Sequence, residues 1–171
     1  AYGILLFCSC FRRDGIRITT ESDAFAARLP ILFKKAFQVE FDQLPADRPG
    51  KRSFLITNTA KIAAIGETFG HDPEESLALH INFGVLEEEH CRASFFRGAF
   101  LTGGSVTDPE KGYHLEMVTS HYNVGREMPA LLRESGFDSK SVERKANYVT
   151  YFKQSEYIED FLTVIGSPVA A

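Results

Sequence analysis

Residues 96–104 read FRGAFLTGG, an apolar stretch of helical character that ends in two glycines. Residues 7–15 read FCSCFRRDG and share this design, because an apolar run is again closed by a glycine. Internal repeats decide an architecture more firmly than single motifs do. The sequence therefore predicts two half-molecules, each of which opens with an apolar helix closed by glycine.

The segments downstream of the two stretches repeat as well. A β-type run reaches a threonine at residues 16–20 and at residues 115–119, and a helix with one apolar face and an internal proline follows each run. A second β-type run, at residues 52–57 and 147–153, then leads to a short helix stopped by glycine. This order predicts an α+β fold, in which two halves form a saddle of antiparallel sheet with helices packed on one face.

The two copies differ in length. Gly15 and Gly104 lie 89 positions apart, whereas Thr20 and Thr119 lie 99 positions apart, so the second copy is ten residues longer. The extra residues, 105–114, contain the turn sequence DPEKG, with proline early and glycine late. They predict a strand with a hairpin turn that the first half lacks.

The repeat also sets the expected domain boundaries. The first half spans residues 1–70 and the second half spans residues 90–171. Residues 71–89 form the linker, and the helix-start sequence HDPEE at its beginning predicts a short helix there.

Composition limits the classes of function. The chain of 171 residues suits one compact unit, and its net charge of −4 disfavours DNA binding by this domain alone, since such domains usually carry a cationic surplus. The longest apolar stretch, residues 4–11, is far shorter than a membrane span. Three cysteines cannot all pair within one chain. We expect a protein of the reducing cytoplasm with no membrane partner.

The paired helix-then-glycine stretches resemble those of the LAGLIDADG homing endonucleases, where two such helices pack side by side and each delivers an acidic residue to a shared metal site. Residues 94–116, SFFRGAFLTGGSVTDPEKGYHLE, resemble the signature block of WhiA proteins. This resemblance covers essentially the whole chain, more loosely in the first half. It implies the amino-terminal LAGLIDADG-like domain of a regulator of sporulation and cell division. It also implies a nucleoid-associated location and a carboxy-terminal helix-turn-helix domain beyond residue 171.

Metal-dependent hydrolysis of DNA needs carboxylates that converge on divalent cations. One copy of the repeat offers Asp14 at the predicted helix end, and the other offers Gly103, which has no ligand atom. We therefore expect no catalytic residue, no bound metal and no cofactor, with Asp14 as a vestigial position. The alternatives are a protein-interaction platform without DNA contact and an active metal-dependent endonuclease.

Small residues mark the expected contact between the two repeated helices. Gly98 inside a helix costs about 1 kcal/mol relative to alanine, a cost usually recovered where another backbone comes close. Its expected counterpart, Ser9, is also small. The sequence predicts that these two positions form the helix interface.

The cysteines do not predict a metal site. Cys8 and Cys10, two positions apart on one expected helix, point away from each other. Cys91 follows His90, but no further cysteine pair or histidine completes a set of four ligands at zinc-site spacing.

Basic residues accompany the predicted strands of both halves and suggest a nucleic-acid surface, although a solvated charged face explains them equally well. The candidates for DNA contact are Arg17, Lys51, Arg52, Lys140, Arg144, Lys145 and Lys153. On the LAGLIDADG scaffold the open sheet face is the DNA saddle, so alternate strand residues would point towards DNA. The expected partners are DNA, mainly through the helix-turn-helix domain, and proteins of the transcription machinery.

Overall fold

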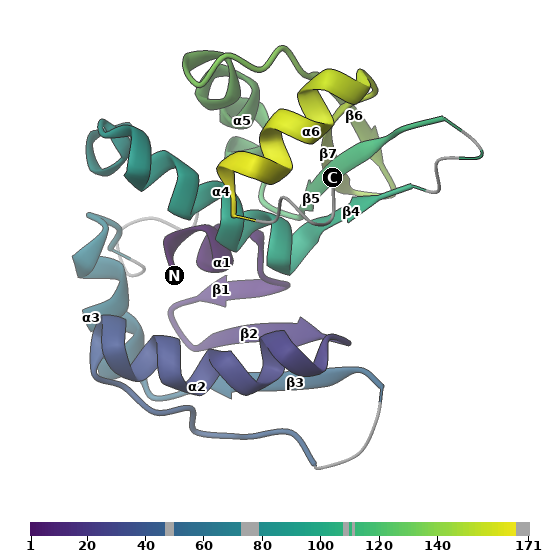
Figure 1. Ribbon diagram of the computed structural model, residues 1–171. Helices are drawn as coiled ribbons and strands as arrows, with labels where there is room; N and C mark the ends of the chain where they lie inside the picture. Colours follow the sequence, from purple (N-terminus) through teal and green to yellow (C-terminus); the bar gives the residue numbers. More distant parts are fainter. Residues whose placement is uncertain (47–49, 73–78, 108–109, 111, 167–171) are drawn as a thin grey trace.

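Two helices lie side by side at the centre of the protein (Figure 1). The structure is a computed structural model, which describes residues 1–46, 50–72, 79–107, 110 and 112–166. The central helices are α1 (Tyr2–Phe7) and α4 (Glu89–Gly103). A side chain at Gly3 would overlap the backbone of Phe95, which lies on α4. The missing side chain lets the two backbones approach each other.

The first half is a three-stranded antiparallel sheet with helices packed on one face. After α1 its elements are β1 (Cys10–Arg12), β2 (Gly15–Thr20), α2 (Asp23–Phe37), β3 (Arg52–Ile56) and α3 (Thr59–Thr68), with strand order β1-β2-β3. Along β2, Ile16 and Ile18 are fully buried while Arg17 is exposed. This alternation assigns one face of the sheet to the core and the other to solvent.

The second half repeats this arrangement with one more strand. Its elements after α4 are β4 (Gly104–Val106), β5 (Leu115–Thr119), α5 (Tyr122–Glu134), β6 (Lys140–Arg144), β7 (Asn147–Phe152) and α6 (Ser155–Val164). The strand order is β4-β5-β7-β6, and every pairing is antiparallel. Leu115 and Met117 of β5 are fully buried. The predicted α+β fold is confirmed, with one sheet in each half rather than a single continuous sheet.

The segment between the halves packs tightly. It contains the short 3₁₀ helix η1 (Phe83–Leu86), and Ile81 is buried. The backbone amide of Asn82 donates to the hydroxyl of Tyr2 at 2.8 Å, and the amide of Ile81 donates to Glu127 Oε1 at 3.1 Å. Most of the helix predicted from the sequence HDPEE falls outside the described residues.

The prediction that the first half lacks the strand following its first helix is wrong. The strand is present as β1, and it joins β2 through a two-residue turn, since Arg12 pairs with Gly15. Among its described residues the first half instead has a single isolated bridge, Gln43 to Leu55, where β6 pairs with β7 in the second half. The misplacement arose because the first helix ends at Phe7 rather than near residue 15.

Candidate nucleic-acid interface

An open hollow of about 360 Å³ lies where the two central helices end. Cys8 and Gly103 line it from the helix ends, and Thr19, Thr102 and Asn147 contribute neutral polar groups. None of the described residues that line this central hollow is acidic. The described lining therefore supplies no carboxylate oxygen for the hard divalent cations that phosphodiester hydrolysis uses.

Cys8 follows the last residue of α1, and its side chain is fully buried. Its Sγ lies 3.1 Å from the carbonyl oxygen of Leu5 and 3.2 Å from that of Cys10, and the two oxygens share the single thiol proton. Burial raises the pKa of the Cys8 thiol to about 12. The group is thus a neutral thiol at physiological pH, and it serves the packing of the helix end rather than cation binding.

Gly103 ends α4 at a point where no side chain fits. A Cβ there would overlap the carbonyl oxygen of Val118 and lie 3.3 Å from Cδ2 of Phe7. An aspartate at this position would therefore require the β5 backbone to move. The local packing thus leaves no room for an acidic side chain at residue 103.

Two expectations for the first half need correction. Asp14 does not lie at a helix end but in the exposed turn between β1 and β2. Since Gly3 and Gly98 face each other across the helix pair, five positions further along each helix lead to Cys8 and Gly103. The structural counterpart of Gly103 is thus Cys8, and neither position carries an acid.

The helix interface is also displaced from the prediction in one copy. A Cβ at Gly98 would lie 3.0 Å from the amide nitrogen of Ile4, which agrees with the close approach expected there. Ser9 lies beyond the end of α1, and its hydroxyl donates to the carbonyl oxygen of Arg17 at 3.1 Å. Gly3, rather than Ser9, is the residue that meets α4.

The open face of the first sheet carries arginines. Arg17 on β2 is exposed, and its register partners are Cys10 on β1 and Leu55 on β3. Arg12 shares this face, because it lies two residues beyond Cys10 on the same strand. Lys51 precedes β3 and is exposed.

The open face of the second sheet carries a denser set of charges. Lys140 and Arg144 lie on it, since they pair with Tyr151 and Asn147 on the face opposite the buried Phe152. Arg144 donates to Glu116 Oε1 at 3.0 Å, which holds its guanidinium against the sheet. Among the described strand residues, Glu116 is the single acidic side chain on either open face.

Glu116 is held ionised by its neighbours. Burial alone would raise the pKa of Glu116, but the hydrogen bonds from Arg144 and His114 outweigh this effect and lower the pKa. The His114 ring stacks on Tyr151, with ring centroids 5.1 Å apart. This cluster of Glu116, His114 and Tyr151 was not predicted from the sequence, although the alternation of apolar and polar residues along β5 indicates that Glu116 faces the open side.

Three of the predicted basic residues occupy other positions. Arg52 is on the helix-covered face and forms an ion pair with Asp23 at the start of α2. Lys145 is in the turn between β6 and β7, with φ of 52°. Lys153 follows β7, and its Nζ lies 5.9 Å from the centroid of the Tyr151 ring. Of the predicted DNA-contact residues, Arg17 remains on the open face of the first sheet, and Lys140 and Arg144 remain on that of the second.

The open faces differ in charge from the rest of the chain. Their described strands carry Arg12, Arg17, Lys140 and Arg144 against Glu116 alone, whereas the chain as a whole has a net charge of −4. These strand residues give the open faces a local surplus of positive charge. Such a local surplus attracts anions even when the total charge is negative.

One group of potential metal ligands lies away from this surface. His90 Nδ1 is 3.2 Å from Glu88, and His90 Nε2 is 3.6 Å from Cys91 Sγ. The group is mostly exposed and supplies three ligands from the described residues. A structural zinc site usually has four, so this trio is an incomplete set.

Comparison with known proteins identifies the family of this chain. The family described as the WhiA LAGLIDADG-like domain matches residues 92–171. A protein named "Probable cell division protein WhiA" from Alkaliphilus oremlandii is 36% identical over 172 residues, which cover 95% of this chain and 54% of that protein. The chain belongs to the WhiA family. A WhiA protein of the same name from Clostridium botulinum is 31% identical over 174 residues, with 96% and 55% covered.

Solved structures share the fold. The N-terminal LAGLIDADG domain of a WhiA protein has a TM-score of 0.66 at 20% identity, over 96% of this chain and 77% of that chain. The homing endonuclease I-DmoI, solved with DNA and Mn, has a TM-score of 0.59 at 12% identity, over 90% and 81%. The chain spans about half the length of the curated WhiA proteins it matches. No helix in the described part of the chain is long and apolar enough to cross a membrane.

Proposed function

We propose that this chain is a non-catalytic, DNA-contacting domain of a bacterial transcription regulator of sporulation and cell division. The relatives are named as cell division proteins, and I-DmoI, which shares the fold, binds DNA in its solved complex. In the proposed arrangement, a helix-turn-helix domain of the same protein performs most of the sequence recognition at the nucleoid. The present domain adds contacts to the phosphate backbone.

The observation that carries this proposal is the contrast between the central hollow and the open sheet faces. The two helix ends hold a neutral thiol and a glycine, while Arg17 and Arg144 stand on the surrounding open faces. Loss of central carboxylates removes both the metal ligands and a source of repulsion towards phosphates. The surface thus favours DNA binding without cleavage.

Salt-dependent binding of the chain to duplex DNA tests the DNA contact. Each phosphate contact contributes about 0.9 to the slope of log affinity against log salt concentration. We expect Arg17→Gln to weaken binding and to lower this slope by about one such unit. Arg144→Gln should weaken binding more, because it also removes the guanidinium that offsets the negative charge of Glu116.

Lys35→Gln is the matched control for these substitutions, since Lys35 is exposed on α2, away from the open faces. If neither arginine substitution changes affinity or slope, the DNA contact is refuted. Incubation of supercoiled plasmid with the chain and Mg²⁺ or Mn²⁺ tests the absence of catalysis. Nicking that persists in highly purified protein would refute the non-catalytic assignment.

A protein-interaction role without DNA contact is the second candidate. An apolar groove on α2 favours it, where Ile31 is 68% exposed and Leu44 is 64% exposed. Lys34 and Lys35 lie at the same groove. Absence of DNA binding at low salt, with intact folding, would favour this alternative over the first.

A further inference from the structure

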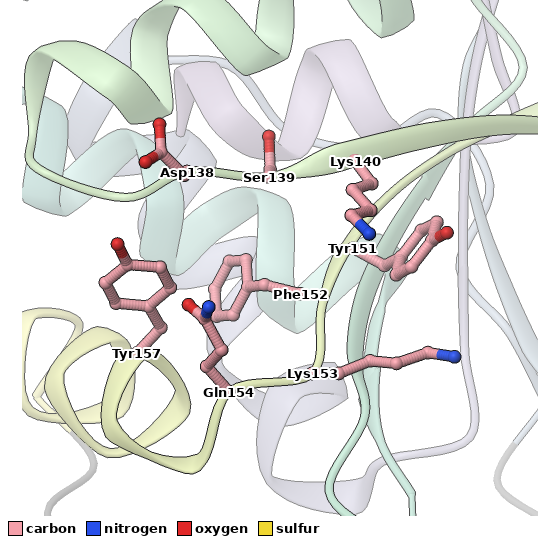
Figure 2. Close-up of a pocket in the computed structure, with 8 residues that line it drawn as sticks. All are labelled: Asp138, Ser139, Lys140, Tyr151, Phe152, Lys153, Gln154 and Tyr157. Atoms are coloured by element: carbon pink, nitrogen blue, oxygen red, sulfur yellow. The ribbon is translucent and has the colours of Figure 1, made fainter.

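We infer that a pocket at the rim of the second sheet binds a nucleoside phosphate. The rim pocket, about 240 Å³ in volume, is formed where β6 begins, β7 ends and α6 starts (Figure 2). Its lining combines lysines, aromatic rings, a carboxylate and an amide. Among the lining residues are Asp138, Lys140, Tyr151, Lys153, Gln154 and Tyr157.

One end of the rim pocket is cationic. Lys140 is the cross-strand partner of Tyr151, and Lys153 Nζ lies 5.9 Å from the centroid of the same ring. Figure 2 shows both lysine side chains on the Tyr151 side of the pocket. No ion pair joins either lysine to an acidic group among the described residues. The two lysines flank Tyr151, and a phosphate seated beside this ring would accept charge-assisted hydrogen bonds from them.

The other end is aromatic and polar. Tyr157 packs edge-on against Phe137 and Phe152, with ring centroids 6.0 and 6.3 Å away, so its ring is held in place. Asp138 and Gln154 lie on the Tyr157 side of the pocket in Figure 2. A carboxylate accepts hydrogen bonds, and an amide both donates and accepts. This end suits a planar base that carries an exocyclic amino group.

The separation of the two ends defines the ligand class. Inorganic phosphate would use the lysines alone, whereas a nucleoside phosphate would also place its base along Tyr157 and its amino group near Asp138. The ligand is either a free mononucleotide or a nucleotide of a DNA strand that leaves the open face. The second source rests on the proposed function, because Lys140 lies on that face.

Calorimetric titration of the chain with dAMP, dTMP and inorganic phosphate tests the inference. We expect dAMP to bind more tightly than dTMP, which lacks an exocyclic amino group, and both to bind more tightly than phosphate. The double substitution Lys140→Gln and Lys153→Gln should weaken dAMP binding at least about tenfold, because both charge-assisted contacts are lost. Asp138→Ala, which removes the acceptor oxygens, should remove the preference for dAMP over dTMP, and Lys35→Gln should change nothing.

Duplex binding distinguishes the two sources. If mononucleotides do not bind but Tyr157→Leu, which removes a pocket ring and no charge, lowers duplex affinity together with the double lysine substitution, the pocket holds a nucleotide of DNA. If neither dAMP nor duplex binding responds to the double substitution, the inference is wrong. In that case a fall in duplex affinity with Arg17→Gln still supports the proposed function. Urea midpoints equal to the parent protein's establish that the variants are folded.

Discussion

Gly103 and Cys8 show what a single residue contributes at the centre of this fold. The absence of an acid at residue 103 was visible in the sequence, but the equivalent position in the first half was not. Asp14 was predicted to lie at a helix end because a glycine follows it, yet the structure places it in a hairpin turn. The two turn residues are Arg13 and Asp14, neither of which has a positive φ, so this turn is not the Asp-Gly type that marks hairpins in a sequence.

Gly103→Ala should destabilise the protein. The new Cβ would overlap the Val118 carbonyl oxygen, so we expect a loss of about 1–3 kcal/mol in the free energy of unfolding, measured by urea denaturation. Gly15→Ala is the control. Its Cβ would meet no atom within 4 Å and its φ is not positive, so we expect a change within about 0.5 kcal/mol. Equal effects of the two substitutions would contradict the assigned close packing.

At the scale of elements, periodicity predicted the longer helices and the central strands well. The predicted strand at residues 115–119 coincides with β5, and the predicted helical core residues Val124, Met128 and Leu132 are all buried. The short strand β1 escaped, because three residues carry too little periodicity to distinguish a strand from a helix. The first-half segment that takes the place of β6 was not predicted either, because its bridge from Gln43 to Leu55 leaves no pattern in the sequence.

Asp42 stabilises the start of helix α3. Its Oδ2 accepts hydrogen bonds from the amides of Thr57 and Asn58 at 2.7 and 2.9 Å, directly before α3, and its Oδ1 lies 2.7 Å from Lys61 Nζ. The hydrogen bond from Lys61, followed by those from the two amides, lowers the pKa of Asp42 to about 2. Asp42→Asn should therefore destabilise the protein by about 1 kcal/mol at neutral pH.

The pH dependence of this contribution has a defined sign. A folded pKa below the unfolded value of about 3.9 means that the stabilisation is complete above that value and is lost as pH falls towards 2. The difference in unfolding free energy between the parent protein and Asp42→Asn should thus be constant from pH 7 to 5 and shrink below about pH 4. Glu40→Gln, at an exposed carboxylate, is the control and should show a difference near zero. A gap that widens on acidification would refute the assignment.

For the whole molecule, the contacts between the halves are central and buried. The hydroxyl of Thr119 in the second half donates to the carbonyl oxygen of Leu6 in the first at 2.8 Å. Helix α1 has six residues, too few for a stable isolated helix, so its stability comes from packing on α4. The sequence predicted the duplication itself, but the residue that joins the copies, Gly3, is recognised only once both helices are placed.

The halves should therefore unfold as one cooperative unit. Hydrogen exchange at increasing urea concentration should show the amides of β2 and β7 opening with the same free energy, because loss of α1 from α4 exposes both cores. Gly3→Ala, whose Cβ would overlap the Phe95 backbone, should lower both opening energies equally, by about 1–3 kcal/mol. Faster exchange confined to β2 would show that the first half opens alone, and the central helix pair would then be a contact between independent units.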